Sequence, residues 1–448
     1  MLQNIMIWII MLTMSASACL TPRDLAPQAP VAHKSGSTPM RPRQQPPATV
    51  MLPLGKGDRF QGGKIAPIGL SGNNRDLGST LNIDEIESGL KGLANVFNDK
   101  FTLFTAPYAT HENRKVHGAI IGEPRVFLQS GVHARERGGP DIVLYFMSDL
   151  LTAQKAGGGL KYGNQTYSNE QVNTALSAGI VFIPMVNPDG VAYDQQTSSC
   201  WRKNRNPHNG TIASSIGVDL NRNFDVLWDG DSLFSQNASK QGLGATDPTK
   251  ETFRGTHPLS EPETKNVDWV MRQHKQLSWL LDLHSDGNEI LYAWGDDDPQ
   301  TTDPSQSFMN KTFDGRRGVL GPEPPTSAYR EYIEAADLVS QKFVTNRMAL
   351  AMNNAGSLQY IAQPSSHLYP TSGSVTDYGG KCGTNRIHGL TIEFGAAEDY
   401  SEIQHSPCTF YPNSRRYHQS IRQVGVAFME LLLSAAGEAG GKKELRCR

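Results

Sequence analysis

The sequence predicts a layered α/β fold in which helices cover a β-sheet. Short apolar runs, such as those at 125–129 and 180–186, have the length and pattern of buried strands. Between the strands lie segments whose apolar residues recur at helical spacing, beginning at 83–96. No internal repeat is evident, which argues against a repeat architecture. Strands that are separated by helices and long loops are typical of an α/β sheet.

The expected elements begin at about residue 81. The first helix rests on apolar residues at helical spacing, namely Ile83, Ile86, Leu90, Leu93 and Val96. The others are a strand at 125–129, a helix at 141–151, strands at 180–186, 277–284 and 390–394, and a closing helix at 421–435. Candidate chemical groups are scattered along this whole stretch. We therefore expect one domain at 81–437, followed by a C-terminal tail at 438–448.

Charge and composition exclude some classes of function. The 448 residues carry 42 Lys and Arg against 44 Asp and Glu, which gives a formal net charge of −2. A chain built around nucleic-acid binding would be strongly basic, so we expect no nucleic-acid partner. Five cysteines in a chain of this length are too few for a disulfide scaffold. The composition describes a globular protein of enzyme size.

The N-terminus has the pattern of an export signal. The apolar run from Ile5 to Leu12 is too short to span a bilayer, and small residues follow it up to Cys19. We expect a signal peptide at 1–18. Its end leaves two outcomes open, lipidation of Cys19 in a lipobox-like context or ordinary cleavage after Ala18. The protein is then exported, as a periplasmic protein, a cell-envelope lipoprotein or a secreted protein, and a lipid on Cys19 is its one expected membrane contact.

Residues 19–80 are predicted to be a proline-rich tether and leader segment. The prolines stand at positions 22, 27, 30, 39, 42, 46 and 47. Proline fixes φ and lacks a backbone donor, so residues 20 to about 52 form neither helix nor sheet and stay extended. The rest of the leader, up to residue 80, is rich in glycine and polar residues.

Three residues suggest a metal site. His133 and Glu136 are three apart at the end of a predicted strand, and His284 ends the apolar strand at 277–284. Catalytic zinc takes three protein ligands and keeps a position for water. Each histidine taken alone is more often a hydrogen-bonded or surface residue, and a single His-x-x-Glu pair is a weak signal.

The surrounding motifs strengthen this interpretation. In chain order they are HARE at 133–136, NPDG at 187–190, WRKNR at 201–205, VDLNRNF at 218–224, FRG at 253–255, SEPE at 260–263, Tyr369 through Asp377, and TIE at 391–393. From about 81 to 435 the chain resembles the zinc carboxypeptidases of the carboxypeptidase A/B type. The resemblance implies an α/β/α sandwich around a mixed, twisted eight-stranded sheet, with the site at the strand ends.

The resemblance also implies a metal centre with one Zn²⁺ per chain. His133, Glu136 and His284 match the zinc ligands. Asp219 matches the carboxylate that orients His133, as metal-bound imidazoles require. Asp219 and Asn221 are two residues apart, so we expect them to share one face of a strand.

Two further positions match catalytic residues. Glu393 matches the general base and acid, because a carboxylate in a dry cleft can take a proton from zinc-bound water and deliver it to the leaving amine. A strand-end salt bridge is the alternative for Glu393. Arg202 matches the side chain that polarises the scissile carbonyl. A solvated basic loop is the alternative for the segment around Arg202.

The remaining matches concern substrate binding. Asn221 and Arg222 match the clamp for a free C-terminal carboxylate, since a planar guanidinium binds a carboxylate in two places. Tyr369 matches the mobile tyrosine that closes over the bound end, and Arg135 matches a contact to the upstream substrate backbone. A carboxylate clamp makes the enzyme an exopeptidase.

The expected preference for the C-terminal side chain of the substrate depends on Thr376. In relatives that remove basic C-terminal residues, the matching position is acidic. A neutral residue there favours apolar or aromatic C-terminal residues. The acidic run at 296–298 is either close to the pocket wall or a solvated loop. Four cysteines follow the signal, at positions 200, 382, 408 and 447, and they allow three pairings.

We therefore expect an exported, monomeric zinc carboxypeptidase whose partners are the C-termini of peptides or proteins. Two alternatives stay open, a carboxypeptidase for cell-wall peptides and a non-catalytic relative that only binds peptide ends. The presence of Glu393 and of all three ligands favours an enzyme.

Overall fold

The structure is a computed structural model of the 448-residue chain. It describes residues 51–72, 77–207, 212–320, 329–381, 387–396 and 406–437. The predicted signal peptide at 1–18, the lipidation site Cys19, the tail at 438–448, and Cys382 and Cys447 lie outside the described residues.

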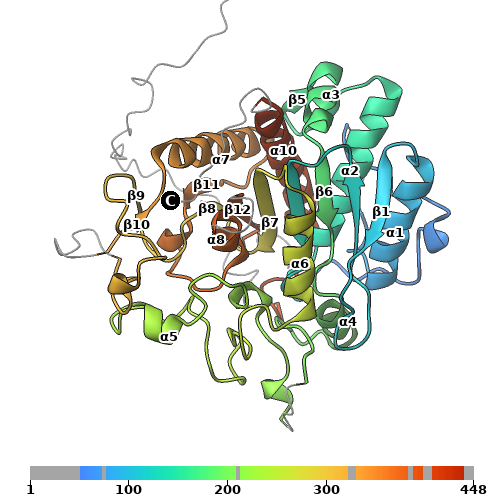
Figure 1. Ribbon diagram of the computed structural model, residues 1–448. Coiled ribbons are helices and arrows are strands. Elements are labelled where there is room, and N and C mark those ends of the chain that lie inside the picture. Colours follow the sequence, from blue (N-terminus) through green and yellow to red (C-terminus); the bar gives the residue numbers. More distant parts are fainter. Residues whose placement is uncertain are drawn as a thin grey trace, which may run out of the picture. The chain divides into compact units, whose positions relative to one another are not determined.

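A mixed eight-stranded sheet forms the centre of the described domain (Figure 1). The strand order is β1-β2-β6-β3-β7-β12-β8-β11. Strands β6, β3, β7 and β12 run parallel to one another, and β8 is antiparallel to β12. The bounds are β1 (Phe101–Thr105), β2 (His117–Ile121), β3 (Val126–Ser130), β6 (Ile180–Ile183), β7 (Trp279–Ser285), β8 (Glu289–Tyr292), β11 (Ile361–Pro364) and β12 (His388–Phe394). The expected mixed eight-stranded sheet is confirmed.

Helices cover both faces of this sheet. Alternate side chains of a strand point to opposite faces, so Leu128 of β3 packs in one hydrophobic cluster and its neighbour Phe127 packs in another. The first cluster is completed by α1 (Ile83–Val96), α2 (Gly139–Ala156), α3 (Asn169–Ser177), α7 (Ala335–Ala355) and α10 (Ser414–Gly437). The second is completed by α6 (Pro262–Gln273) and α8 (Val375–Gly380). This arrangement is the predicted α/β/α sandwich.

Short elements complete the described fold. They are the helices α4 (Pro188–Thr197) and α5 (Gly230–Leu233), the strand pair β4 (Leu160–Tyr162) and β5 (Gln165–Tyr167), and the pair β9 (Pro299–Gln300) and β10 (Glu331–Tyr332). Among the described residues, no helix combines the length and apolar character that a membrane crossing requires.

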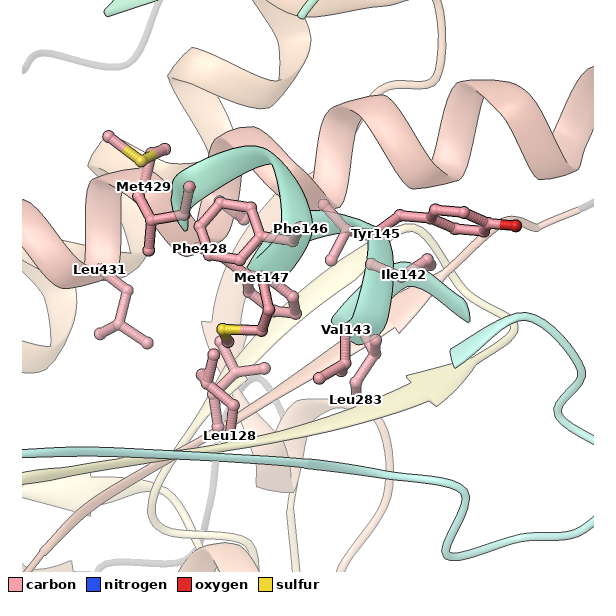
Figure 2. Close-up of a cluster of buried hydrophobic side chains, with 14 of the residues drawn as sticks. Leu128, Ile142, Val143, Tyr145, Phe146, Met147, Leu283, Phe428, Met429 and Leu431 are labelled. Atoms are coloured by element: carbon pink, nitrogen blue, oxygen red, sulfur yellow. The ribbon is translucent and has the colours of Figure 1, made fainter. Parts of the chain in front are cut away.

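The larger cluster joins α2 and α10 to the middle of the sheet (Figure 2). Val143 and Met147 of α2 lie fully buried beside Leu128 and Leu283 of the strands. The ring of Phe428 on α10 meets Phe146 edge-on, with 5.1 Å between the centroids. This packing fixes β3 and β7, and the predicted metal ligands lie at or just after the ends of these strands.

Part of the predicted leader segment packs on this domain. Leu52, Phe60 and Leu70 are buried in the same hydrophobic cluster as the sheet and its helices. Arg59 forms an ion pair with Glu85 of α1, with 2.6 Å between nitrogen and oxygen. The domain boundary at residue 81 stays a prediction, and the described end of the leader packs on the domain ahead of that boundary.

Candidate metal centre and substrate cavity

The candidate site lies where three parallel strands end. The carboxyl ends of β3, β7 and β12 meet at one edge of the sheet, and such edges are where open α/β sheets bind ligands. His133 and Glu136 follow β3, His284 lies near the end of β7, and Glu393 lies near the end of β12. His284 and Glu393 are directly opposite each other across the β7–β12 pair. The sheet therefore brings together residues that are up to 260 positions apart in the sequence.

A tight turn after β3 brings His133 and Glu136 together. The turn begins at Gly131, whose φ of 63° favours glycine. A Cβ at this position would also lie only 3.2 Å from the Cα of Met185. The amide of Glu136 then donates to the carbonyl of His133 over 3.2 Å. Asn187, from the NPDG motif, holds the same segment by donating from Nδ2 to the carbonyl of Val132 over 3.0 Å.

The donor atoms of His133, Glu136 and His284 all lie within 4.8 Å of one another. Nδ1 of His133 is 2.6 Å from one carboxylate oxygen of Glu136, and Nδ1 of His284 is 2.8 Å from the other. The two Nδ1 atoms are 3.0 Å apart. Two imidazole nitrogens and a carboxylate that converge in this way fit one zinc ion.

Each imidazole of the metal centre also contacts a second, buried carboxylate through its Nε2 atom. The Nε2 atom of His133 is 3.1 Å from Asp219, and the Nε2 atom of His284 is 2.5 Å from Asp282. Each carboxylate accepts a hydrogen bond from the Nε2–H group of its imidazole, which keeps the proton on Nε2 and leaves the lone pair of Nδ1 free for a metal. Asp219 was predicted in this position. Asp282 was not, although its place two residues before His284 on the same strand was a usable signal.

The carboxylates make this centre attractive to a cation. Burial alone would lower the pKa of His284, but the carboxylates of Asp282 and Glu136 raise it well above its usual value. Burial alone would raise the pKa of Glu136, but the two histidines lower it well below its usual range. A field that holds a proton on a buried imidazole also favours a divalent cation in the proton's place.

Asp219 connects the metal centre to the neighbouring arginine. Its Oδ2 atom accepts hydrogen bonds from Arg202 Nη2 over 2.9 Å and from Nε over 3.1 Å. Its Oδ1 atom accepts the amide of Asn221 over 3.0 Å. Residues 220–222 form a 3-10 turn, so the expectation that Asp219 and Asn221 share a strand face is wrong. The turn arises because the side chain of Asp219 caps it.

Glu393 faces the metal centre from β12. Burial raises the pKa of Glu393 to about 8, and it does so against the lowering effect of His284 and Arg202. A carboxyl group whose pKa lies near neutral pH is matched to moving a proton in either direction. Glu393 forms no ion pair among the described residues, so the salt-bridge alternative finds no support there.

A cavity of about 250 Å³ adjoins these residues. The predicted site residues that line it are His133, Glu136, Arg202, Asn221, Arg222, Tyr369, Thr376 and Glu393. Arg222 is buried and donates to the carbonyl of Asn221 over 2.6 Å, while its Nε atom has no partner among the described residues. The Thr376 hydroxyl is 2.7 Å from that of Thr391.

Three predicted site residues do not line this cavity, namely Asp219, His284 and Arg135. The guanidinium of Arg135 donates to both carboxylate oxygens of Glu251, over 2.9 and 3.1 Å, and lies over the ring of Phe410.

Phe410 lines the cavity and was not predicted. It stands two residues after Cys408, which forms a disulfide with Cys200. This pairing selects one of the connectivities that the sequence left open.

The acidic run after Gly295 begins close to the pocket wall, since the carbonyl of Gly295 accepts the amide of Thr371, which lines the cavity, over 2.7 Å. Asp296 and Asp297 are each 1% exposed, so this is not a solvated loop, and neither residue lines the cavity. Asp297 accepts the amide of Gly318 over 2.9 Å and pairs with Arg330 over 3.1 Å. The run supports the fold beneath the pocket.

We expect Asp282→Asn to weaken zinc binding by about 10- to 100-fold, because the amide cannot hold the His284 ring as a carboxylate does. The measurement is a competitive zinc titration of the purified protein. Asp149→Asn is the matched control, since Asp149 is a buried carboxylate that bonds to the backbone of Leu70 and Ser71 instead. Unchanged zinc affinity in Asp282→Asn would contradict the role given to this carboxylate.

Comparisons with known proteins agree with this geometry. Carboxypeptidase O from Bos taurus is 31% identical over 196 residues, which are 42% of this chain and 45% of the relative. Carboxypeptidase B from Astacus astacus is 27% identical and covers 47% of this chain and 63% of the relative. The chain thus spans about half the length of these relatives.

Solved structures share the fold. Bovine thrombin-activatable fibrinolysis inhibitor, in complex with tick carboxypeptidase inhibitor, superposes with a TM-score of 0.59 at 19% identity, over 81% of this chain and 98% of that one. Carboxypeptidase A from Helicoverpa armigera gives a TM-score of 0.56 at 21% identity, over 81% and 75%. The family model described as zinc carboxypeptidase matches residues 86–422. That range holds the whole metal centre and the cavity, and the chain belongs to the zinc carboxypeptidase family.

Proposed function

We propose that this protein is a zinc-dependent exopeptidase that hydrolyses the C-terminal peptide bond of peptides and proteins. One observation carries the proposal. One cavity is lined by His133 and Glu136 of the metal centre, by a buried carboxyl group with a raised pKa, and by a buried arginine whose Nε atom has no partner in the described part of the chain. These are the parts that cleavage beside a free carboxylate requires.

Each residue has a distinct task in this proposal. His133, Glu136 and His284 would hold the zinc ion, which when bound acidifies water and polarises a carbonyl. Glu393 accepts the proton of the attacking water and later delivers it to the leaving amine. Arg202, held by Asp219, donates to the oxygen on which negative charge develops.

The substrate's end is held separately from the reacting bond. Arg222 and Asn221 bind the C-terminal carboxylate, and Tyr369 closes over it. Arg135 contacts the upstream backbone only after its guanidinium leaves Glu251. Thr376 is neutral, which is the argument for apolar or aromatic C-terminal residues.

Export also belongs to the proposal. The disulfide between Cys200 and Cys408 supports it, because structural disulfides persist in oxidising compartments outside the cytosol. A monomer in the periplasm, in the envelope or outside the cell is the proposed form, and a lipid on Cys19 is its proposed link to a membrane. Cell-wall peptides stay an alternative substrate class.

Metal removal tests the proposed chemistry. The purified protein should release single C-terminal residues from peptides, lose this activity on dialysis against a chelator, and regain it with about one equivalent of zinc. Mass spectrometry of the digested peptides and metal analysis give the two readouts. Full activity in a zinc-free sample would contradict the proposal.

A further inference from the structure

Two acidic side chains that line the cavity have no task in this chemistry, Asp286, which lies near Arg416, and Glu289. Glu289 lies at the start of β8 and lines the cavity with the catalytic residues. Glu136 belongs to the metal centre and Glu393 to proton transfer. Glu289 is neither a metal donor nor the residue that moves the proton. No sequence motif pointed to it.

The sheet register places Glu289 on the far side of Glu393 from the metal. Glu289 is directly opposite Glu393 across the β8–β12 pair, and Glu393 is directly opposite His284 across the β12–β7 pair. The next row on this face pairs Leu291 with Thr391. Arg222, the proposed partner of a terminal carboxylate, lines the same cavity as Glu289.

The carboxylate of Glu289 is only half satisfied. Its Oε1 atom accepts a hydrogen bond from Gln363 Nε2 over 3.2 Å, while its Oε2 atom is buried and has no partner among the described residues. No ion pair within the described ranges involves Glu289. Burial raises its pKa. A buried oxygen without a donor costs stability, so a carboxylate that served only the fold would have both oxygens bonded.

The surroundings of Glu289 suit a polar side chain better than an aromatic one. Six serine and threonine residues line the cavity, Ser285, Ser365, Thr371, Ser374, Thr376 and Thr391. The Thr371 hydroxyl is a second buried group without a partner among the described residues. Gly287 leaves space beside both carboxylates, since a Cβ there would lie 3.0 Å from the Cβ of Glu393 and 3.7 Å from Oε2 of Glu289.

We propose that Glu289 is a specificity-determining residue that selects substrates whose C-terminal side chain ends in a cation, an ammonium or a guanidinium group. This inference rests on the proposed exopeptidase function and names its substrate class. Lysine and arginine carry such a group, and so does the diaminopimelic acid of cell-wall peptides. A neutral Thr376 does not oppose it, because the charge comes from the wall of the cavity rather than from its floor.

The test is a set of N-terminally blocked dipeptides that differ only in the last residue, Arg, Lys, Phe, Leu or Glu. The wild-type protein should show a higher kcat/KM for Arg and Lys than for Phe and Leu. In Glu289→Gln the ratio of Arg to Phe should fall by about 10- to 100-fold, the range for one hydrogen bond to a charged group. Glu289→Lys should raise the ratio of Glu to Arg, a gain that misfolding cannot produce.

Asp286→Asn is the matched control. Asp286 also lines the cavity, but its carboxylate already lies 3.8 Å from Arg416. This variant should leave the ratio of Arg to Phe unchanged. A tripeptide ending in diaminopimelic acid compares the two sources of the cation, and preference for either supports the assignment.

Two results would overturn the assignment and leave the exopeptidase intact. One is a wild-type preference for Phe or Leu, as Thr376 alone would suggest, and the other is an unchanged ratio of Arg to Phe in Glu289→Gln. Release of no C-terminal residue from any of the peptides would instead overturn the exopeptidase function, and the assignment with it.

Discussion

Glu393→Gln should lower kcat by about 10²- to 10⁴-fold while zinc content stays at the wild-type level. The amide cannot accept a proton from water, so the variant loses the proton carrier. Zinc stays because Glu393 is not one of the three converging donors. Steady-state kinetics on one good peptide and metal analysis of the same sample make the comparison.

The control for this variant is Glu170→Gln, which makes the same change at an exposed site in the first turn of α3. Its kcat and zinc content should match those of the wild type. If Glu393→Gln loses zinc together with activity, Glu393 is a ligand and the assignment of roles in the site is wrong.

Arg202→Ala and Arg222→Ala should affect different kinetic constants. In the proposed mechanism Arg202 acts on a charge that develops only during the reaction, so its loss should lower kcat by about 10²- to 10³-fold. Arg222 meets a carboxylate that is charged throughout, so its loss should raise KM substantially and lower kcat less. Both constants must be resolved on one dipeptide substrate.

The structure adds a condition to this comparison. Arg202 bonds to Asp219, which in turn contacts His133, so Arg202→Ala also needs a check of its zinc content. A KM defect alone in Arg202→Ala, with a kcat defect alone in Arg222→Ala, would show that the placement of the two arginines is reversed.

The sequence predicted the elements whose apolar residues follow a clear period. The helix expected from the residues at 83–96 is α1, and the strand expected at 125–129 is β3 shifted by one residue. The sequence analysis did not predict the long helix α7, because the apolar residues of this helix lie on its buried side and on its exposed side. Met348 and Met352 are fully buried, whereas Phe343 and Leu350 are 62% and 64% exposed, so no single face carries the pattern.

The residues of the site divide in the same way, into those that sequence spacing predicts and those that it does not. Motif order pointed to His133, Glu136 and His284, and these residues do converge. Glu289 could not be found in this way, because its place beside Glu393 depends on the pairing of β8 with β12. Cross-strand register joins segments about 100 residues apart, and nothing in local periodicity specifies it.

The most direct test of the account compares one peptide in two forms, with a free C-terminal carboxylate and with a C-terminal amide. The central claim is that Arg222 and Asn221 hold the carboxylate and so make the enzyme an exopeptidase. The free acid should lose its last residue in a zinc-dependent reaction, and the amide should be cleaved at least about 100-fold more slowly, since a charge-assisted, bidentate contact is lost. Equal turnover of the two peptides would contradict the claim.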